Sequence, residues 1–174
     1  LGISSPSTVP NTQHCWAGAA CTTNGIGLTE VRLYDSRLER ITTARACWEV
    51  NNGTTISTCD QLYDDSTATW FVSTRPGTLR VILDLGATVD VSRIEIVNYN
   101  ENMLTDYGAK IVDLYLHPKA TGEGVPTEAA VFTPRYQILN DVTITQAASS
   151  GATTVTSFDD RALSNTLSGA LSCA

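Results

Sequence analysis

Two adjacent aspartates, followed closely by hydroxyl side chains, are the residues of this chain best suited to chemistry. Asp64 and Asp65 offer carboxylate oxygens, and Ser66 and Thr69 follow within the same short stretch. Ca²⁺ takes about six to eight such hard oxygen ligands, and backbone carbonyls of the loop can complete the shell. The same residues also suit a solvated turn in which Asp64 caps backbone amides. The spacing therefore predicts either a calcium site or an Asp-rich turn.

The sequence lacks the motifs of common catalytic sites. It has no Gly-x-Ser-x-Gly elbow, no His-Glu-x-x-His helix and no Gly-rich phosphate loop. His14 lies beside Cys15, but nucleophilic catalysis needs a thiolate that a base holds in a defined cleft. Both residues lie in an N-terminal stretch that is better suited to supplying disulfides. We therefore expect a protein that is not an enzyme.

Five cysteines, at positions 15, 21, 47, 59 and 173, form no CxxC pair, which argues against zinc. Free buried thiols are one interpretation. The Ser- and Thr-rich composition and the sequon Asn52-Gly53-Thr54 favour an oxidising, extracellular setting with a glycan on Asn52. We then expect Cys47 to pair with Cys59 across a short polar loop, and Cys173 to pair with Cys15 or Cys21. The cysteine left over suggests an intermolecular link or a missing partner segment.

Charge and hydropathy limit the partners of the chain. The formal net charge is -7, and 42% of the residues are hydrophobic. Nucleic acid and anionic membrane surfaces need clustered cations, which the sequence does not provide. No apolar run is long enough to span a bilayer. The composition therefore predicts a domain with a substantial core, no nucleic-acid partner and no membrane insertion.

Apolar residues alternate with polar ones along several short segments, whereas helical periodicity is almost absent. This pattern predicts an all-β, antiparallel sandwich or barrel. We expect residues 1–28 to form an extended or irregular N-terminal segment and residues 29–174 to form a single β-sandwich domain. Only 159–171 could hold a brief helix. The predicted strands lie at 31–33, around 41, and at 78–85, 92–99, 110–117, 136–139, 142–145 and 153–158.

Four motifs occur in order along the middle of the chain: Leu62-Tyr63-Asp64-Asp65-Ser66-Thr67-Ala68-Thr69-Trp70, Asp84-Leu85-Gly86, Val91-Ser92-Arg93-Ile94-Glu95-Ile96, and Val112-Asp113-Leu114-Tyr115-Leu116. Residues 30–118 thereby resemble the discoidin family, also called the coagulation-factor C-type or galactose-binding-like domains. The first motif departs from the family in having Asp65 where glycine is expected. The resemblance implies a jelly-roll sandwich, a structural calcium that pins the acidic loop so that Trp70 enters the core, and a binding site for ligands, often terminal sugars, on loops at one end.

Aromatic and polar side chains on such loops suit sugar recognition, because rings stack on C–H groups and amides bind hydroxyls. The candidates are Trp48 and Glu49, in the loop closed by Cys47 and Cys59, together with Asn98, Asn100, Asn102 and Tyr107. We expect Trp70 and Tyr115 to be core residues instead.

The sequence predicts a non-catalytic extracellular module for adhesion or carbohydrate binding, within a larger surface protein or assembly. The alternative is a structural subunit of an extracellular filament, coat or matrix. In that case Ile3–Thr12 would dock on a neighbouring copy, for example by adding a strand to its sheet edge. The expected partners are accordingly a glycan, other copies of the chain or another extracellular protein.

Overall fold

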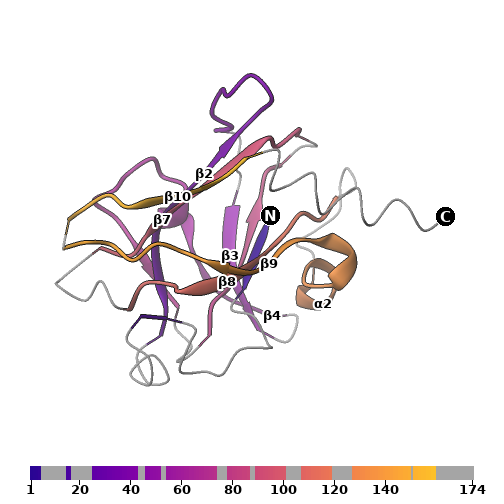
Figure 1. The fold of residues 1–174 in the computed structure, drawn as a ribbon. Helices are drawn as coiled ribbons and strands as arrows, with labels where there is room; N and C mark the ends of the chain where they lie inside the picture. Colours follow the sequence, from indigo (N-terminus) through magenta and orange to yellow (C-terminus); the bar gives the residue numbers. More distant parts are fainter. Residues whose placement is uncertain are drawn as a thin grey trace.

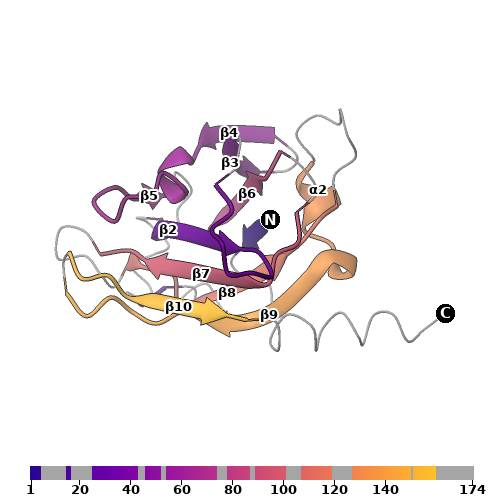
Figure 2. The same cartoon turned by 90° about the horizontal axis from the view of Figure 1, so that it is seen from above.

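The structure is a computed structural model. It describes residues 1–4, 15–16, 25–42, 46–51, 54–73, 78–86, 89–100, 107–118, 127–149 and 151–159. They form two antiparallel sheets, so the all-β sandwich prediction is confirmed. The six-stranded sheet has the order β4 (Thr54–Thr58), β3 (Ala46–Asn51), β6 (Arg80–Asp84), β1 (Gly2–Ser4), β8 (Ile111–Tyr115) and β9 (Gln137–Thr143). The four-stranded sheet has the order β10 (Val155–Phe158), β7 (Arg93–Asn98), β2 (Gly27–Tyr34) and β5 (Phe71–Val72). Figure 2 shows β2, β7 and β10 side by side in this order.

The main core lies between the sheets and follows from the alternation of side chains along the strands. Val81 and Leu83 of β6 point into it, and Leu33 of β2 packs there with Ile94 and Ile96 of β7. These side chains are at most 5% exposed. The structured helical pieces are short: η3 (Asp60–Leu62), α2 (Glu128–Val131) and η5 (Pro134–Tyr136).

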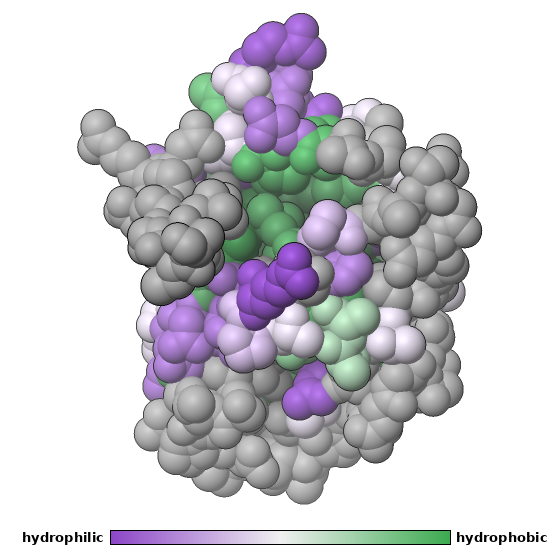
Figure 3. All heavy atoms as spheres, turned by 90° about the vertical axis from the view of Figure 1, so that its right-hand side faces the viewer, coloured by the Kyte–Doolittle hydropathy of each residue, from purple (hydrophilic) through white to green (hydrophobic). Residues whose placement is uncertain are grey.

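A smaller apolar cluster lies on the opposite face of the six-stranded sheet. Its buried members are Val50, Ile82, Tyr115 and Val131, with Trp48 and Phe132 partly buried against them. The rings of Tyr115 and Phe132 meet edge to face with centroids 5.2 Å apart. Because this cluster buries Tyr115, its predicted role as a core residue is confirmed. Figure 3, which views the molecule from the side of α2, shows apolar surface gathered in a hollow bordered by hydrophilic side chains.

The expectation of an irregular segment outside the sandwich is wrong for residues 2–4, which form β1 in the middle of the larger sheet. Ile3 pairs with Val81 of β6 on one side and with Leu114 of β8 on the other, and it is 2% exposed. Figure 1 accordingly marks the amino terminus inside the fold. Ile3 therefore cannot dock on the sheet edge of a neighbour while it holds this place. Residues 5–12 lie outside the described part of the chain.

Most of the predicted strands are confirmed, with boundaries shifted by one to four residues: β2, β6, β7, β8 and β10. The predicted strands 136–139 and 142–145 are a single strand, β9. The described residues around Ile41, up to residue 42, form no strand, and Arg40 makes an isolated bridge to Tyr34. The helix expected in 159–171 falls outside the described residues, apart from Asp159.

Candidate functional site

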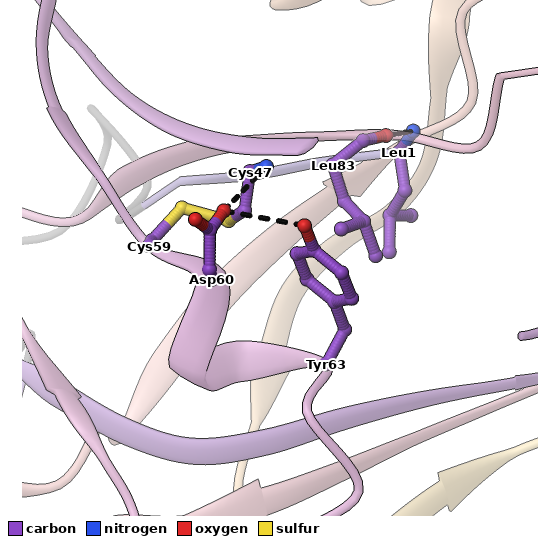
Figure 4. The surroundings of a disulfide bond; sticks show 6 residues. All are labelled: Leu1, Cys47, Cys59, Asp60, Tyr63 and Leu83. Carbon is purple, nitrogen blue, oxygen red and sulfur yellow. Dashed lines mark hydrogen bonds between the residues drawn. A yellow bond between two sulfur atoms is a disulfide. The ribbon is translucent and has the colours of Figure 1, made fainter. Parts of the chain in front are cut away.

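The Cys47–Cys59 disulfide is confirmed, but it does not close a polar loop. It joins the beginning of β3 to the residue that follows β4, and these strands pair as a hairpin. Both cysteines are at most 1% exposed. Asp60 Oδ1 accepts hydrogen bonds from the Cys47 amide at 3.4 Å and from the Tyr63 hydroxyl at 3.2 Å (Figure 4). A disulfide between buried cysteines is typical of a protein that folds under oxidising conditions.

Cys15 is also disulfide-bonded, and it is 1% exposed beside Ala109, with which it forms a bridge. Its partner lies outside the described residues. Because Cys47 and Cys59 pair with each other, that partner is Cys21 or Cys173. The predicted pairing of Cys173 and the link through a leftover cysteine stay predictions.

Asn98 and Asn100, two of the predicted ligand-binding residues, are buried and make hydrogen bonds within the fold. Asn98 is 0% exposed, and its Nδ2 donates to the carbonyls of Ala109 at 2.8 Å and Thr145 at 2.9 Å. Asn100, 1% exposed, accepts from the Thr29 hydroxyl at 3.3 Å and donates to a backbone carbonyl at 3.1 Å. Their amides are therefore occupied by internal hydrogen bonds rather than presented to a ligand.

The other four predicted ligand residues do not complete one site. Trp48 and Glu49 belong to β3, so their side chains point to opposite faces of the six-stranded sheet. Trp48 packs in the outer cluster, whereas Glu49 is 1% exposed and accepts a hydrogen bond from the Ser73 hydroxyl. Tyr107 is half-buried against the main core. Asn102 lies outside the described residues.

The structure instead gathers aromatic side chains where β2 begins, β7 ends and β8 begins. We call Trp16, Trp70, Tyr99, Tyr107 and Lys110 the aromatic end. The Lys110 ammonium lies 5.1 Å from the centroid of the Trp16 ring, and the rings of Trp70 and Tyr99 meet edge to face at 6.5 Å. Tyr99 is buried, and the other four are half-buried, so each presents part of its surface to solvent.

Backbone pairings bring the aromatic end together from distant parts of the chain. The Trp16 amide donates to the Gly108 carbonyl at 3.4 Å, and Gly27 bridges Gly108. Tyr99 lies against Gly27, where an added Cβ would stand 2.7 Å from the Tyr99 ring. Sequence reasoning missed Trp16, Tyr99 and Lys110 because no local pattern relates them.

The acidic loop makes internal hydrogen bonds of the kind expected for an Asp-rich turn, and the predicted calcium site stays a prediction. Asp64 Oδ1 accepts from the Ser66 amide at 3.0 Å, and Asp64 Oδ2 accepts from the Thr69 hydroxyl at 2.7 Å. Ser66 Oγ accepts from the Ala68 amide at 3.1 Å. Among the described residues, no three His, Cys, Asp or Glu side chains are placed to hold a metal ion together. Trp70, which follows the turn, is only half-buried.

Asp65 is turned away from this hydrogen-bond network and pairs with Arg40. The Arg40 guanidinium also pairs with Glu30 Oε1 at 2.6 Å, and the Glu30 side chain is 0% exposed. Burial raises the pKa of Glu30 to about 7, although the Arg40 charge and hydrogen bond lower it. The second oxygen, Oε2, is buried without a hydrogen-bond partner in the described part of the chain.

Comparisons with models of known protein families, with curated proteins and with solved structures found no match. No helix of the described residues is long and apolar enough to cross a bilayer. The function must therefore be argued from the geometry of the chain itself.

Proposed function

We propose that this chain is a non-catalytic, extracellular β-sandwich module that binds carbohydrate through its aromatic end. The observation that carries the proposal is that half-buried Trp16, Trp70 and Tyr107 lie with Lys110 at one end of the sandwich. Ring faces stack on the C–H groups of a pyranose, and the lysine ammonium donates hydrogen bonds to its hydroxyls or to a carboxylate. The likeness of residues 30–118 to the discoidin family agrees with this ligand class.

Buried asparagines support such a site by fixing the strand ends on which it stands. The Asn98 side chain, at the end of β7, makes hydrogen bonds to residue 109, just before β8, and to residue 145. The Asn100 side chain makes hydrogen bonds to Thr29 of β2 and to residue 152. A surface held in this way loses little conformational entropy when a ligand binds. Asn98 and Asn100 therefore contribute to binding through rigidity and not through contact.

The compartment is proposed from the cysteines and the sequon. The buried Cys47–Cys59 disulfide suits an oxidising environment, and Asn52-Gly53-Thr54 is an acceptor sequence for an N-linked glycan. Asn51 and Thr54 pair at the end of the β3–β4 hairpin, so Asn52 and Gly53 connect the two strands. A module of this kind acts in adhesion within a larger surface protein.

A glycan array tests the proposal, with the unreduced protein first shown to be monomeric by light scattering. Trp16→Ala and Lys110→Ala should each weaken binding about tenfold or more, because each removes a central contact. Trp48→Ala is the matched control, since Trp48 belongs to the outer cluster and should leave binding unchanged. Absence of binding across a broad array of neutral and acidic glycans would refute the proposal, and so would equal losses for Trp16→Ala and Trp48→Ala.

A further inference from the structure

Three carboxylates lie close together where the acidic loop approaches β2. Asp64 and Asp65 belong to the loop between η3 and β5, and Glu30 belongs to β2. Arg40 pairs with both Glu30 and Asp65, which brings the loop carboxylates near Glu30, and the charge of Asp64 also raises the pKa of Glu30. Like charges at such a position destabilise the fold unless a cation lies among them.

Arg40 supplies that cation from within the chain. One arm of its guanidinium reaches Glu30 Oε1 at 2.6 Å, and the other reaches Asp65 Oδ1. The Arg40 side chain is 22% exposed, so the pair with Glu30 is largely shielded from water. The planar fork of arginine can bind two carboxylates at once, whereas a lysine ammonium is a single point charge.

The backbone conformation of Asp65 agrees with its role as a partner of Arg40. Its φ is 63°, in the left-handed region that favours glycine and that Asp tolerates better than most other residues. Asp65 is also the position at which the acidic motif departs from the glycine of the discoidin family. The aspartate pays a small backbone cost, and its carboxylate gains the ion pair with Arg40 that a glycine could not make.

The loop, as folded, does not fit a calcium ion. Both Asp64 oxygens already accept hydrogen bonds from Ser66 or Thr69, and Asp65 faces the guanidinium. A divalent cation at Asp65 would be repelled by the adjacent Arg40 charge. We propose that the Arg40 guanidinium takes the place of a metal ion, so that the acidic loop and the Trp70 that follows it are held without calcium. This inference does not depend on what the aromatic end binds.

The first test compares melting temperatures of the whole protein with millimolar CaCl₂ and with a chelator. We expect the two melting temperatures to agree to within about 1 °C, since a ligand that does not bind gives no linkage. A calcium site filled at 100 times its Kd would raise the melting temperature by about 5–10 °C, and a rise of that size would overturn the proposal.

The second test removes the guanidinium at about pH 8, where Glu30 is ionised. Arg40→Met keeps much of the side-chain stem and should lower the melting temperature by about 5–10 °C, because Glu30 must then either keep a buried, unpaired charge or take up a proton far above its unfolded pKa. Arg37→Met is the matched control: Arg37 pairs with Asp35 and Glu39, but its side chain is 73% exposed. That control should change the melting temperature by less than about 3 °C. Equal effects of the two variants would overturn the proposal.

A double variant separates the ion pair from simple loss of packing. Adding Glu30→Gln to Arg40→Met removes the unpaired charge, so the double variant should melt above the single Arg40→Met variant. A double variant that melts below the wild type by the sum of the two single effects would refute the ion pair. If Arg40→Met does not fold, Asp65→Asn serves instead, because Asn also tolerates the left-handed region while it removes one carboxylate. Asp65→Asn should lower the melting temperature, and the melting temperature of this variant should not change with added calcium. A rise with calcium, in this variant or in the wild type, would count against the proposal.

Discussion

Replacing Asn98 tests whether that residue holds the fold or binds a ligand. Its Nδ2 donates to two backbone carbonyls, at 2.8 and 2.9 Å, and its Oδ1 accepts from the Tyr99 amide at 2.9 Å. The side chain is 0% exposed, so water cannot replace these bonds without entering the fold. Asn98→Ala therefore removes three hydrogen bonds and leaves their backbone partners unsatisfied.

The expected loss of unfolding free energy in Asn98→Ala follows from these three hydrogen bonds. A buried backbone group that loses its partner costs about 1–3 kcal/mol. Part of the loss is recovered by relaxation and by water at Thr145, which is nearer the surface, so we expect about 3–5 kcal/mol in total. For a domain of this size, that lowers the melting temperature by about 10 °C.

Thermal unfolding followed by circular dichroism measures the change, with Asn140→Ala as the control. Asn140 is exposed on β9, and its substitution should stay within about 0.5 kcal/mol. Asn98→Asp places a carboxylate against two carbonyl oxygens, so its loss should be larger near neutral pH and should shrink in acid, where the new carboxyl is protonated. A variant Asn98→Ala that melts like the wild type but has lost glycan binding would show that Asn98 is a ligand residue after all.

Three further predictions follow from the disulfide, from Glu30 and from Trp70. Removing the Cys47–Cys59 disulfide, which spans a sequence separation of 12, should cost about 3 kcal/mol, visible as a lower denaturant midpoint of the double variant Cys47→Ala/Cys59→Ala. The pKa of Glu30 is raised to about 7 in the folded protein, so its favourable contribution is complete below the unfolded pKa of about 4.5 and is lost as pH rises through 7. The wild type should therefore lose about 3 kcal/mol relative to Glu30→Gln between pH 5 and pH 8, and parallel pH profiles would contradict this. Trp70→Ala should cost about 2–3 kcal/mol, less than a fully buried tryptophan, because the ring is half-buried edge-on to Tyr99; an unchanged melting temperature would show that the contact contributes nothing.

The strands that the sequence predicts well are those whose signal is local. Residues 78–85 are β-branched and apolar and are followed by Gly86, and 110–117 alternate up to Pro118, so β6 and β8 lie close to their predicted places. β1 was missed because three residues are too short to show a period. β3 and β4 were missed although a local signal exists, since Asn52-Gly53 between them is a favoured two-residue hairpin connection.

The candidate site was harder to predict, because its residues meet only through long-range pairing. An asparagine at the end of a strand can bind a ligand or make hydrogen bonds to nearby backbone groups. Asn98 does the second, because the carbonyls of residues 109 and 145 come within hydrogen-bond distance. Trp16 reaches Lys110 through the bridge between Cys15 and Ala109. The acidic loop left a calcium site and an Asp-rich turn open, because the sequence does not show that Arg40 lies beside Asp65.

The place of β1 sets the timing of folding during synthesis. The Leu1–Leu83 hydrogen bond spans 82 residues, and the pairing of Ile3 with Leu114 spans more. Ribosomes add about 5–20 residues per second, so Gly2–Ser4 wait roughly 6–22 s before β6 and β8 have both been made. The hairpin of β3 and β4 can form early, whereas β1 has no strand to pair with until β6 is made and no second partner until β8 is made. The pairing of β1 is a late, slow step, and the newly made chain is most exposed to aggregation just before it.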